Sequence, residues 1–428
     1  MLKETIKLLC KQNNIANEII DFVNKKEKMI SNKFNRIDEI SEYNQLKILS
    51  AMQKSRLDST HFNWTTGYGY GDIGREKVEK IYSDIFNTED ALVRPTIVSG
   101  THALSLTLFG ILRPGDEIIS ASGKPYDTLL KVLGERGEES GNLKEYNINY
   151  KEVPLKNNEI DIDNLIKSIT TKTKIVMIQR STGYSFRKAL TINQIKNAIL
   201  EIKKTKKDII CMVDNCYGEF VDVIEPTDVG ADVMAGSLIK NPGGGIALTG
   251  GYIVGKKNII DKISNASTAP GIGKECGLTF GTTRRTLQGL FLAPKIVGDS
   301  LKVALLTSKI FEDLGYEVIP RVKDERSDII QAIKMNSKEK VVTFCQAIQS
   351  ASPVDSHVKL EPWDMPGYNE PVIMASGAFI EGSSIELSAD APIREPYNVY
   401  LQGGLNYFHG KFGVMKALDD MRKKNLIK

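Results

Sequence analysis

The chain has 428 residues, 41% of them hydrophobic and 26% charged, which is typical of a soluble globular protein with two or three domains. The formal net charge is +4, from 57 basic and 53 acidic residues, so the balance indicates no binding of nucleic acid or of an anionic membrane. Five scattered cysteines without a CxxC pair argue against a disulfide framework or a structural zinc site, and favour a reducing compartment.

Targeting and membrane signals are absent from the sequence pattern. The start MLKETIKLLCKQNN lacks the apolar core and the cleavage site of a signal peptide. Apolar stretches stay well below the ~18 residues that a membrane helix needs. We therefore expect a cytoplasmic protein that binds neither a membrane nor a metal ion.

Residues 1–65 are polar and have the periodicity of helices, with apolar residues spaced three and four apart. Their apolar content is too low for an independent core. We expect an N-terminal helical arm that packs on the rest of the molecule or on a neighbouring subunit.

Residues 66–290 alternate short apolar runs with amphipathic segments. The predicted strands are ALVRPTIVSG, DEIISASG, TKIVMIQRS, DIICMVDN, DVMAGSLIK and GGYIVG. The predicted helices between or before them include REKVEKIYSDIF, THALSLTLFGIL, PYDTLLKVLGERG and TINQIKNAILEIKKTKK. This alternation predicts a large α/β domain with a mostly parallel sheet, whose ligands bind beyond the carboxyl ends of the strands.

Residues 291–428 form a second, smaller region. A long helical stretch, GLFLAPKIVGDSLKVALLTSKIFEDLG, leads into EVIP, KVVTFCQAIQ, PVIMASGAFI and SSIELSAD, and the helix FGVMKALDDMRKKN closes the chain. We expect a smaller C-terminal α+β domain.

The stretch GYGYGDIG places Gly69, Gly71 and Gly74 in GxGxxG spacing. A dinucleotide-binding fingerprint requires a strand directly before the glycines and an acidic residue after the next strand. The preceding THFNWTT makes a poor buried strand, so we reject that interpretation. The stretch is either a glycine loop that carries Tyr68 and Tyr70 towards a ligand or a flexible turn before a helix.

A candidate phosphate site follows the first predicted strand, which we expect to end at Ser99, Gly100 and Thr101 directly before a helix. A helix N-terminus offers unpaired N–H groups and a positive dipole end to an anion, and two hydroxyl groups add donors. Ordinary helix capping by serine or threonine explains the same residues. His102, in the same turn, suits a ligand contact or a cap equally well.

Two chemically distinctive residues follow later strands. Asp214 ends the strand in DIICMVDN, and Lys240 lies between a strongly apolar run and three consecutive glycines in GSLIKNPGGG. Lysine is rarely buried without compensation, and glycine lets a ligand or a backbone approach closely. We expect both side chains to emerge at the same edge of the sheet as Ser99.

Phosphate site, aspartate and lysine together have one economical explanation, pyridoxal 5′-phosphate. Its phosphate needs an anion site, its pyridinium nitrogen an acidic partner and its aldehyde a lysine for a Schiff base. Tyr126, in SGKPYDTLL after another predicted strand, is placed to stack on the ring.

With these residues in view, most of the chain resembles fold-type I, aspartate aminotransferase-like pyridoxal-phosphate enzymes of the cysteine and methionine metabolism group. It is most similar to the methionine gamma-lyase or cystathionine beta-lyase family, whose members are also called aluminium resistance proteins. The stretches that carry the resemblance are TTGYGYGDIGREKVEKIY, VSGTHAL, MVDNCYGEF, GSLIKNPGGGIALTGGYIVG, APGIGKECG and REPYNVYLQGGL.

The resemblance implies roles for individual residues. Lys240 becomes the Schiff-base lysine, Tyr126 the stacking residue and Asp214 the pyridinium partner. The implied phosphate ligands are Ser99, Gly100, Thr101 and Ser237. In the broader group a tyrosine and an arginine of the neighbouring subunit also reach the phosphate. Tyr70 or Tyr68 is expected to serve here, although the Tyr-x-Arg pair itself is missing.

Arg394, in ADAPIREPYNVY, matches the region where such enzymes hold the substrate α-carboxylate, a role that suits a planar guanidinium. A salt bridge between domains is the competing explanation. Arg180, Arg284 and Arg285 are weaker candidates for the same role. The Asn-Pro that usually precedes the aspartate-bearing strand is replaced by QRSTGYSFR, which sets the chain apart from the well-studied branch.

By resemblance we expect a carbon–sulfur lyase that converts a sulfur-containing amino acid into a thiol, a 2-oxo acid and ammonia. Lys240 would remove the α-proton, with burial and nearby positive charge lowering its pKa. A homodimer or homotetramer with shared active sites is implied, and the glycines after Lys240 would let backbone approach the cofactor and the subunit interface. Aldol cleavage of a β-hydroxy amino acid and non-enzymatic ligand or metal binding linked to aluminium resistance remain alternatives.

Overall fold

The computed structural model describes residues 2–365, 368 and 370–427, which form two compact units. The larger unit comprises residues 43–183 and 189–293, and the smaller unit comprises residues 1–42, 184–188 and 294–428. The domain boundaries predicted at residues 65 and 290 concern domains that fold separately, and they stay a prediction. The first segment does not stand alone, because its residues are divided between the two units.

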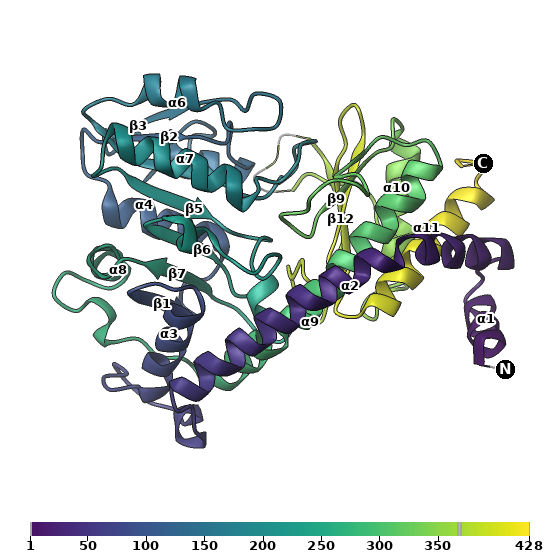
Figure 1. The fold of residues 1–428 in the computed structure, drawn as a ribbon, viewed down its shortest axis with the longest axis horizontal. Coiled ribbons are helices and arrows are strands. Elements are labelled where there is room, and N and C mark those ends of the chain that lie inside the picture. Colours follow the sequence, from purple (N-terminus) through teal and green to yellow (C-terminus); the bar gives the residue numbers. More distant parts are fainter. Residues whose placement is uncertain (1, 366–367, 369, 428) are drawn as a thin grey trace. The chain divides into compact units, whose positions relative to one another are not determined.

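A seven-stranded sheet forms the centre of the larger unit (Figure 1). Its strands, in spatial order, are β1 (Asp90–Arg94), β7 (Gly251–Gly255), β6 (Val233–Ser237), β5 (Ile210–Asp214), β4 (Thr173–Gln179), β2 (Glu117–Ser120) and β3 (Asn149–Glu152). All neighbouring pairs from β6 to β3 are parallel, and β7 is antiparallel to both of its neighbours. The six other strands therefore share one direction, which confirms the mostly parallel sheet.

The helices of this unit connect the strands and bury their apolar sides on the sheet. They are α3 (Ile73–Ile85), α4 (Gly100–Ile111), α5 (Asp127–Leu133), α6 (Ile162–Ser168), α7 (Ile192–Thr205) and α8 (Lys257–Ser267). Short 3₁₀ helices are η1 (Ser59–Phe62), η2 (Pro226–Val229), η3 (Asn241–Gly243) and η4 (Gly273–Glu275). Leucines and isoleucines of α4, α5 and α8 share one core with the strands, as expected for a sheet buried by its crossover helices.

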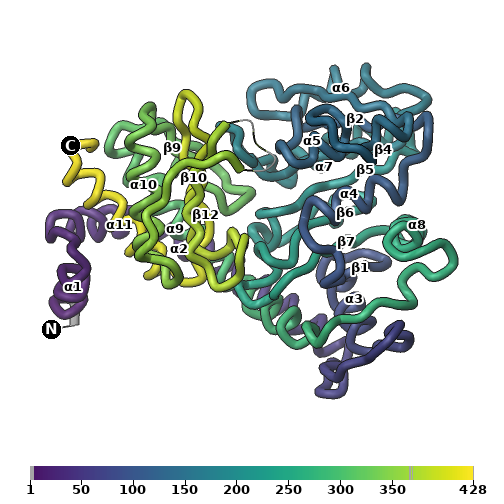
Figure 2. The backbone as a smooth tube through the Cα atoms, turned by 180° about the vertical axis from the view of Figure 1, so that it is seen from behind, coloured from purple at the N-terminus to yellow at the C-terminus, as the bar shows by residue number. Residues whose placement is uncertain are grey.

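The smaller unit has a five-stranded antiparallel sheet. Its strands, in spatial order, are β10 (Val372–Ala375), β11 (Ser388–Pro392), β12 (Asn398–Gln402), β9 (Gln331–Lys334) and β8 (Val318–Ile319). Its helices include α1 (Leu2–Gln12), α10 (Lys338–Ser350) and α11 (Tyr407–Lys423). Both views show α1 and the end of α11 at the same end of this unit (Figures 1 and 2). The predicted α+β character is confirmed.

Two long helices contribute residues to both units: α2 (Asn17–Lys54) and α9 (Thr283–Asp313). In the smaller unit the first half of α2 buries Ile19, Ile20 and Val23 in the same core as α10 and α11. The helical rhythm of the N-terminal segment is thereby confirmed, and its apolar stripe packs within the same chain. None of the described helices is both long and apolar enough to cross a bilayer.

Two predicted strand ends are wrong. β1 ends at Arg94, not at Ser99, because Pro95 lacks the N–H group that the ladder requires and Ile97 instead bonds the carbonyl of Arg94 in a turn. β6 ends at Ser237, three residues before Lys240. The strands β3, β9 and β12 were not predicted, since they are short or carry polar residues such as NYKE.

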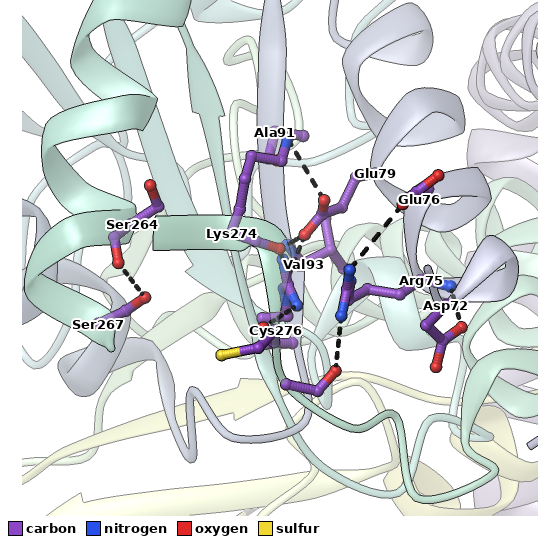
Figure 3. Close-up of polar contacts among 12 residues, drawn as sticks. Asp72, Arg75, Glu76, Glu79, Ala91, Val93, Ser264, Ser267, Lys274 and Cys276 are labelled. Atoms are coloured by element: carbon purple, nitrogen blue, oxygen red, sulfur yellow. Dashed lines mark hydrogen bonds and ion pairs between the residues drawn. The ribbon is translucent and has the colours of Figure 1, made fainter. Parts of the chain in front are cut away.

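A buried charge network joins α3 and β1 to the segment around Lys274 (Figure 3). Arg94 Nε donates to Glu79 Oε1 at 2.7 Å, and both side chains are almost fully buried. The other guanidinium nitrogens of Arg94 donate to the carbonyls of Cys276 and Lys274. Burial raises the pKa of Glu79, while the positive charges of Arg94 and Lys274 act in the opposite direction.

Arg75 is a second buried arginine, and it joins the glycine loop of GYGYGDIG to the segment around Glu275 and Gly277. Its guanidinium donates to the carbonyls of Gly69, Gly277 and Glu275 at 2.7–3.0 Å. Gly277 in turn donates its N–H to the carbonyl of Tyr68. The loop is thus fixed against another segment of the chain, and no strand precedes it among the described residues, in agreement with the rejection of a dinucleotide fingerprint.

Glu79→Gln is expected to destabilise the protein by about 3 kcal/mol or more, because it leaves the buried Arg94 guanidinium without its counter-charge. Urea unfolding followed by circular dichroism measures the change. The control is Glu201→Gln, which removes an exposed ion pair with Lys204 and should cost less than about 1 kcal/mol. Equal, small effects of both substitutions would contradict the structural role of the network.

Candidate active site

Lys240 lies beyond the carboxyl end of β6, at the start of the 3₁₀ helix η3. The residue keeps some exposed surface, and its Nζ atom lies over the ring of Tyr217, 4.0 Å from the ring centroid. An ammonium group at this distance is attracted by the negative face of an aromatic ring. The reactive candidate is therefore held against a residue that the sequence analysis did not single out.

The turn after β5 places Tyr217 under the lysine. Tyr217 has φ = 71°, a left-handed conformation that is uncommon for a bulky residue and must be imposed by its surroundings. Arg180 Nη1 fixes residues on both sides of Tyr217 by donating to Asn215 Oδ1 and to the carbonyl of Gly218, each at 2.9 Å. The Asn215 amide also donates to Glu225 at 3.0 Å. A signal for Tyr217 existed in the sequence, since it follows Asp214 by three residues and precedes a glycine.

Arg180 was a weaker candidate for binding a substrate carboxylate. Its side chain is fully buried, bonds the turn just described and lies 3.4 Å from Glu225. These contacts give it a structural role in holding the turn.

Asp214 is the last residue of β5 and is buried. Its Oδ1 atom accepts the N–H of Cys216 at 3.1 Å, and no ion pair of Asp214 occurs among the described residues. Burial raises the pKa of the Asp214 carboxyl, while the positive charge of Lys240 lowers it. A buried carboxyl group that can still accept a hydrogen bond suits a protonated ring nitrogen, which is the role expected from the sequence.

The predicted phosphate residues come together at the N-terminus of α4. Ser99 is the N-cap, and its Oγ atom accepts the N–H of His102 at 3.1 Å. A Cβ atom added to Gly100 would lie 3.3 Å from Cys216 Sγ and 3.4 Å from Ser237 Cβ. Residue 100, the turn after β5 and the end of β6 therefore converge, and a side chain at residue 100 would make a tight contact with Cys216.

Contacts of Tyr126 and His102 further define this cradle. Tyr126 OH donates to Thr101 Oγ1 at 3.0 Å, so the expected stacking residue is tied to the expected phosphate residue. The Tyr126 N–H donates to Gln179 Oε1, at the end of β4. Burial raises the pKa of Tyr126, as does the charge of Asp214. His102 Nδ1 accepts the N–H of Val98, which favours a capping role for this histidine over a ligand contact.

The expectation that positive neighbours lower the pKa of Lys240 is wrong for the protein without ligands. Burial lowers this pKa, but four acidic groups outweigh burial and raise the pKa to well above its ordinary value. They belong to Cys216, Tyr217, Asp214 and Tyr126. Lys240 is therefore an ammonium ion at neutral pH until something else occupies the site.

The glycines after Lys240 serve close packing within the chain. A Cβ atom on Gly243 would lie 1.8 Å from the carbonyl oxygen of Leu238, and one on Gly289 would lie 2.1 Å from the carbonyl oxygen of Gly243. The loop therefore packs directly on the backbone of α9. An approach of the same glycines to a cofactor or to a second subunit stays a prediction.

Other predicted residues have contacts of their own. Arg394, in the smaller unit, forms an ion pair with Glu370 at 3.4 Å and is partly exposed. Arg284 lies over the ring of Phe62, 4.2 Å from its centroid, and Arg285 is exposed. Tyr68 and Tyr70 are 77% and 61% exposed, and their ring centroids lie 5.8 Å apart. Their expected contribution to a neighbouring subunit, and the substrate role of Arg394, remain predictions.

Comparison with known proteins places this arrangement in a family. Residues 19–422 match the family model described as methionine gamma-lyase. The chain belongs to the methionine gamma-lyase family. This confirms the resemblance inferred from the sequence motifs.

Relatives with high similarity cover nearly the whole chain. The uncharacterized protein YnbB of Bacillus subtilis (strain 168) is 51% identical over 394 residues, which are 92% of this chain and 94% of YnbB. The crystal structure of a carbon–sulfur lyase involved in aluminium resistance from Clostridium novyi NT is 52% identical, with a TM-score of 0.94 over 97% of this chain and 99% of that one.

A distant likeness extends the fold assignment. The O-acetylhomoserine (thiol)-lyase structure from Campylobacter jejuni, solved with a pyridoxyl-lysine monophosphate, is 15% identical over 80% of this chain and 86% of that one, with a TM-score of 0.55. Together with the larger parallel sheet and the smaller antiparallel sheet, the comparisons confirm the predicted fold-type I architecture.

Tyr217→Leu is expected to lower the pKa of Lys240 in the ligand-free protein by up to about one unit, because the ring face that favours the ammonium form is lost. NMR of ¹⁵N-labelled lysine side chains across a pH series measures it. Tyr217→Phe keeps the ring and loses only the hydroxyl group, so it should lower the pKa of Lys240 less than the leucine variant does. Equal pKa values in the leucine and phenylalanine variants would rule out the ring contact as the cause.

Proposed function

We propose that this protein is a pyridoxal 5′-phosphate-dependent carbon–sulfur lyase that acts on a sulfur-containing amino acid. The observation that carries the proposal is the convergence of Lys240, Asp214 and the N-terminus of α4 at one edge of the parallel sheet. Membership of the methionine gamma-lyase family supports it, as does the likeness to a carbon–sulfur lyase.

The donor set fits this cofactor. Ser99, Gly100, Thr101 and Ser237 would hold the phosphate through hydroxyl groups and the free N–H groups of a twelve-residue helix. Tyr126 would lie on the ring, and Asp214 would bond its nitrogen. Gly100 supports the fit independently, because a side chain there would meet Cys216 and Ser237 and would fill the cradle.

Bound in this way, the cofactor supplies an electron sink for the electron pair that remains on the substrate Cα when its proton leaves. Lys240 Nζ is the base that takes this proton and later returns it. Because acidic neighbours favour the ammonium form of Lys240 in the protein without ligands, its amine must lose a proton before it can act as a base. Asp214, as a buried carboxylate, keeps the opposing ring nitrogen protonated.

The overall reaction would consume water and release a thiol, a 2-oxo acid and ammonia. Elimination at the β carbon converts cystathionine into homocysteine and pyruvate, and elimination at the γ carbon converts methionine into methanethiol and 2-oxobutyrate. Arg394 would bind the substrate α-carboxylate in exchange for Glu370, a partner that it holds at the long distance of 3.4 Å.

Assembly and location are part of the proposal. A homodimer or homotetramer would let Tyr70 or Tyr68, which are exposed here, reach the phosphate of a neighbouring subunit. The place of action would be the cytoplasm, which suits a chain with five free cysteines.

The first test is the visible absorbance of the purified protein with pyridoxal phosphate. We expect a yellow band that borohydride abolishes, that Lys240→Ala lacks and that the control Lys256→Ala keeps, since Lys256 pairs with Asp232 away from the cluster. A colourless protein that stays colourless with added cofactor would overturn the proposal.

The second test is product analysis with cystathionine, methionine and cysteine. Formation of a 2-oxo acid is expected from at least one of them, and failure with all three would rule out this chemistry. Arg394→Ala should lower kcat/KM by about 10- to 100-fold, mainly through KM, because a charge-assisted contact with the carboxylate is lost. Arg422→Ala removes an exposed arginine of α11 and should change neither constant.

A further inference from the structure

Glu219 is a buried carboxyl group for which the proposed reaction has no use. Its side chain is fully buried, and its Oε1 atom accepts the hydroxyl of Tyr252 at 2.7 Å. No residue in the described part of the chain donates a hydrogen bond to its Oε2 atom. A buried carboxylate normally has a cation or several N–H donors, so this environment suits a neutral, protonated acid.

Other buried glutamates of the chain are better compensated. Glu225 lies 3.4 Å from Arg180 and accepts the amide of Asn215. Glu386 accepts two backbone N–H groups, at 2.8 and 2.9 Å. The donors to Glu219 are neutral: the Tyr252 hydroxyl and its own backbone N–H, and neither reaches Oε2. The difference lies in the surroundings, not in burial alone.

The carboxyl group is fixed directly behind the Lys240 loop. The side-chain amide of Asn241, the residue after the lysine, donates to the carbonyl of Glu219 at 3.0 Å. On the other side Gly236 of β6 leaves the space that the acid needs, since a Cβ atom there would lie 2.8 Å from Glu219 Oε1 and 2.7 Å from the Tyr252 hydroxyl. Glu219 and Lys240 also interact electrostatically.

The groups that face Glu219 come from several elements. Tyr252 of β7, Tyr82 of α3, Cys216 of the same turn and Glu225 at the start of η2 all act on it or are acted on by it, together with Lys240. Burial raises the pKa of Glu219 to about 8, while the Tyr252 hydroxyl and Lys240 oppose the rise. The pKa values of Tyr82, Tyr252 and Cys216 are raised by burial, so these groups stay neutral as Glu219 titrates.

We propose that Glu219 is a positioning residue that stores one proton behind the Lys240 loop and controls how readily Lys240 holds its own. While Glu219 is neutral, the protonation of Lys240 depends only on the other groups around the lysine. When the stored proton is released, a negative charge arises near Lys240 and favours its ammonium form. The role is that of a pH-sensitive partner of the lysine, and its relevance to catalysis rests on the proposed function.

The storage of the proton is tested without any cofactor. A carboxyl whose folded pKa lies above its unfolded value contributes stability that is present below about pH 4.5 and is lost as the pH rises through about 8. Glu219→Gln, which stays neutral, escapes this loss. Its melting temperature minus that of the wild type should therefore increase by a few degrees between pH 6 and pH 9.

Two further variants sharpen this test. Glu386→Gln replaces a buried carboxyl that has two N–H donors, and Tyr252→Phe removes the donor that lowers the pKa of Glu219. The phenylalanine variant should move the stability loss to higher pH, because its Glu219 holds the proton more strongly. A carboxylic-acid band in the infrared spectrum at pH 7 that disappears in Glu219→Gln, and stays in Glu386→Gln, is the direct signature. A constant melting difference together with no such band would overturn the proposal.

The influence on Lys240 is tested in the protein loaded with pyridoxal phosphate. The pH at which its visible absorbance changes should be lower in Glu219→Gln than in the wild type and unchanged in Glu386→Gln. An unchanged pH in both variants would reject the coupling. A loaded protein without any visible band would reject the proposed function instead, and the melting and infrared results would still decide whether Glu219 stores a proton.

Discussion

The contact of Arg180 with the turn after β5 is the constraint on which the site depends. By bonding Asn215 and the carbonyl of Gly218, this buried guanidinium holds Tyr217 in a left-handed conformation that a tyrosine does not adopt freely. The same seven-residue turn carries Asp214 at one end and Glu219 near the other. An aspartate, an aromatic ring and a proton-storing acid are thereby set around one lysine by a single piece of backbone.

Much of this arrangement follows from the sequence, since parallel strands place the residues after their carboxyl ends at one edge of the sheet. Asp214, Lys240 and the start of α4 were found in this way, without any contact being known. Tyr217 and Glu219 were not, because their roles depend on a strained turn and on burial. The periodicity of the stretch DNCYGEF reveals neither the strained turn nor the burial of these side chains.

The errors have equally definite causes. Apolar content alone carried the predicted first strand through Pro95 to Ser99, although proline cannot donate to the ladder. The charges around Lys240 were predicted wrongly, because the neighbours that raise its pKa are acidic groups from the end of β5, from the turn after it and from the start of α5. Arg394 and Tyr70 differ from these cases because their expected roles involve a second molecule. Arg394 is expected to bind a substrate, and Tyr70 is expected to contact a neighbouring subunit.

The close approach of Gly243 and Gly289 makes the position of the Lys240 loop depend on a helix that follows much later in the chain. Neither residue has a functional group, yet the loop that begins at Lys240 can take its path only while both lack a side chain. The position of the Lys240 amine therefore also depends on Gly289, which lies in α9, forty-nine residues further along the chain. A side chain at either glycine would displace the loop that carries Lys240, although the lysine itself would be unchanged.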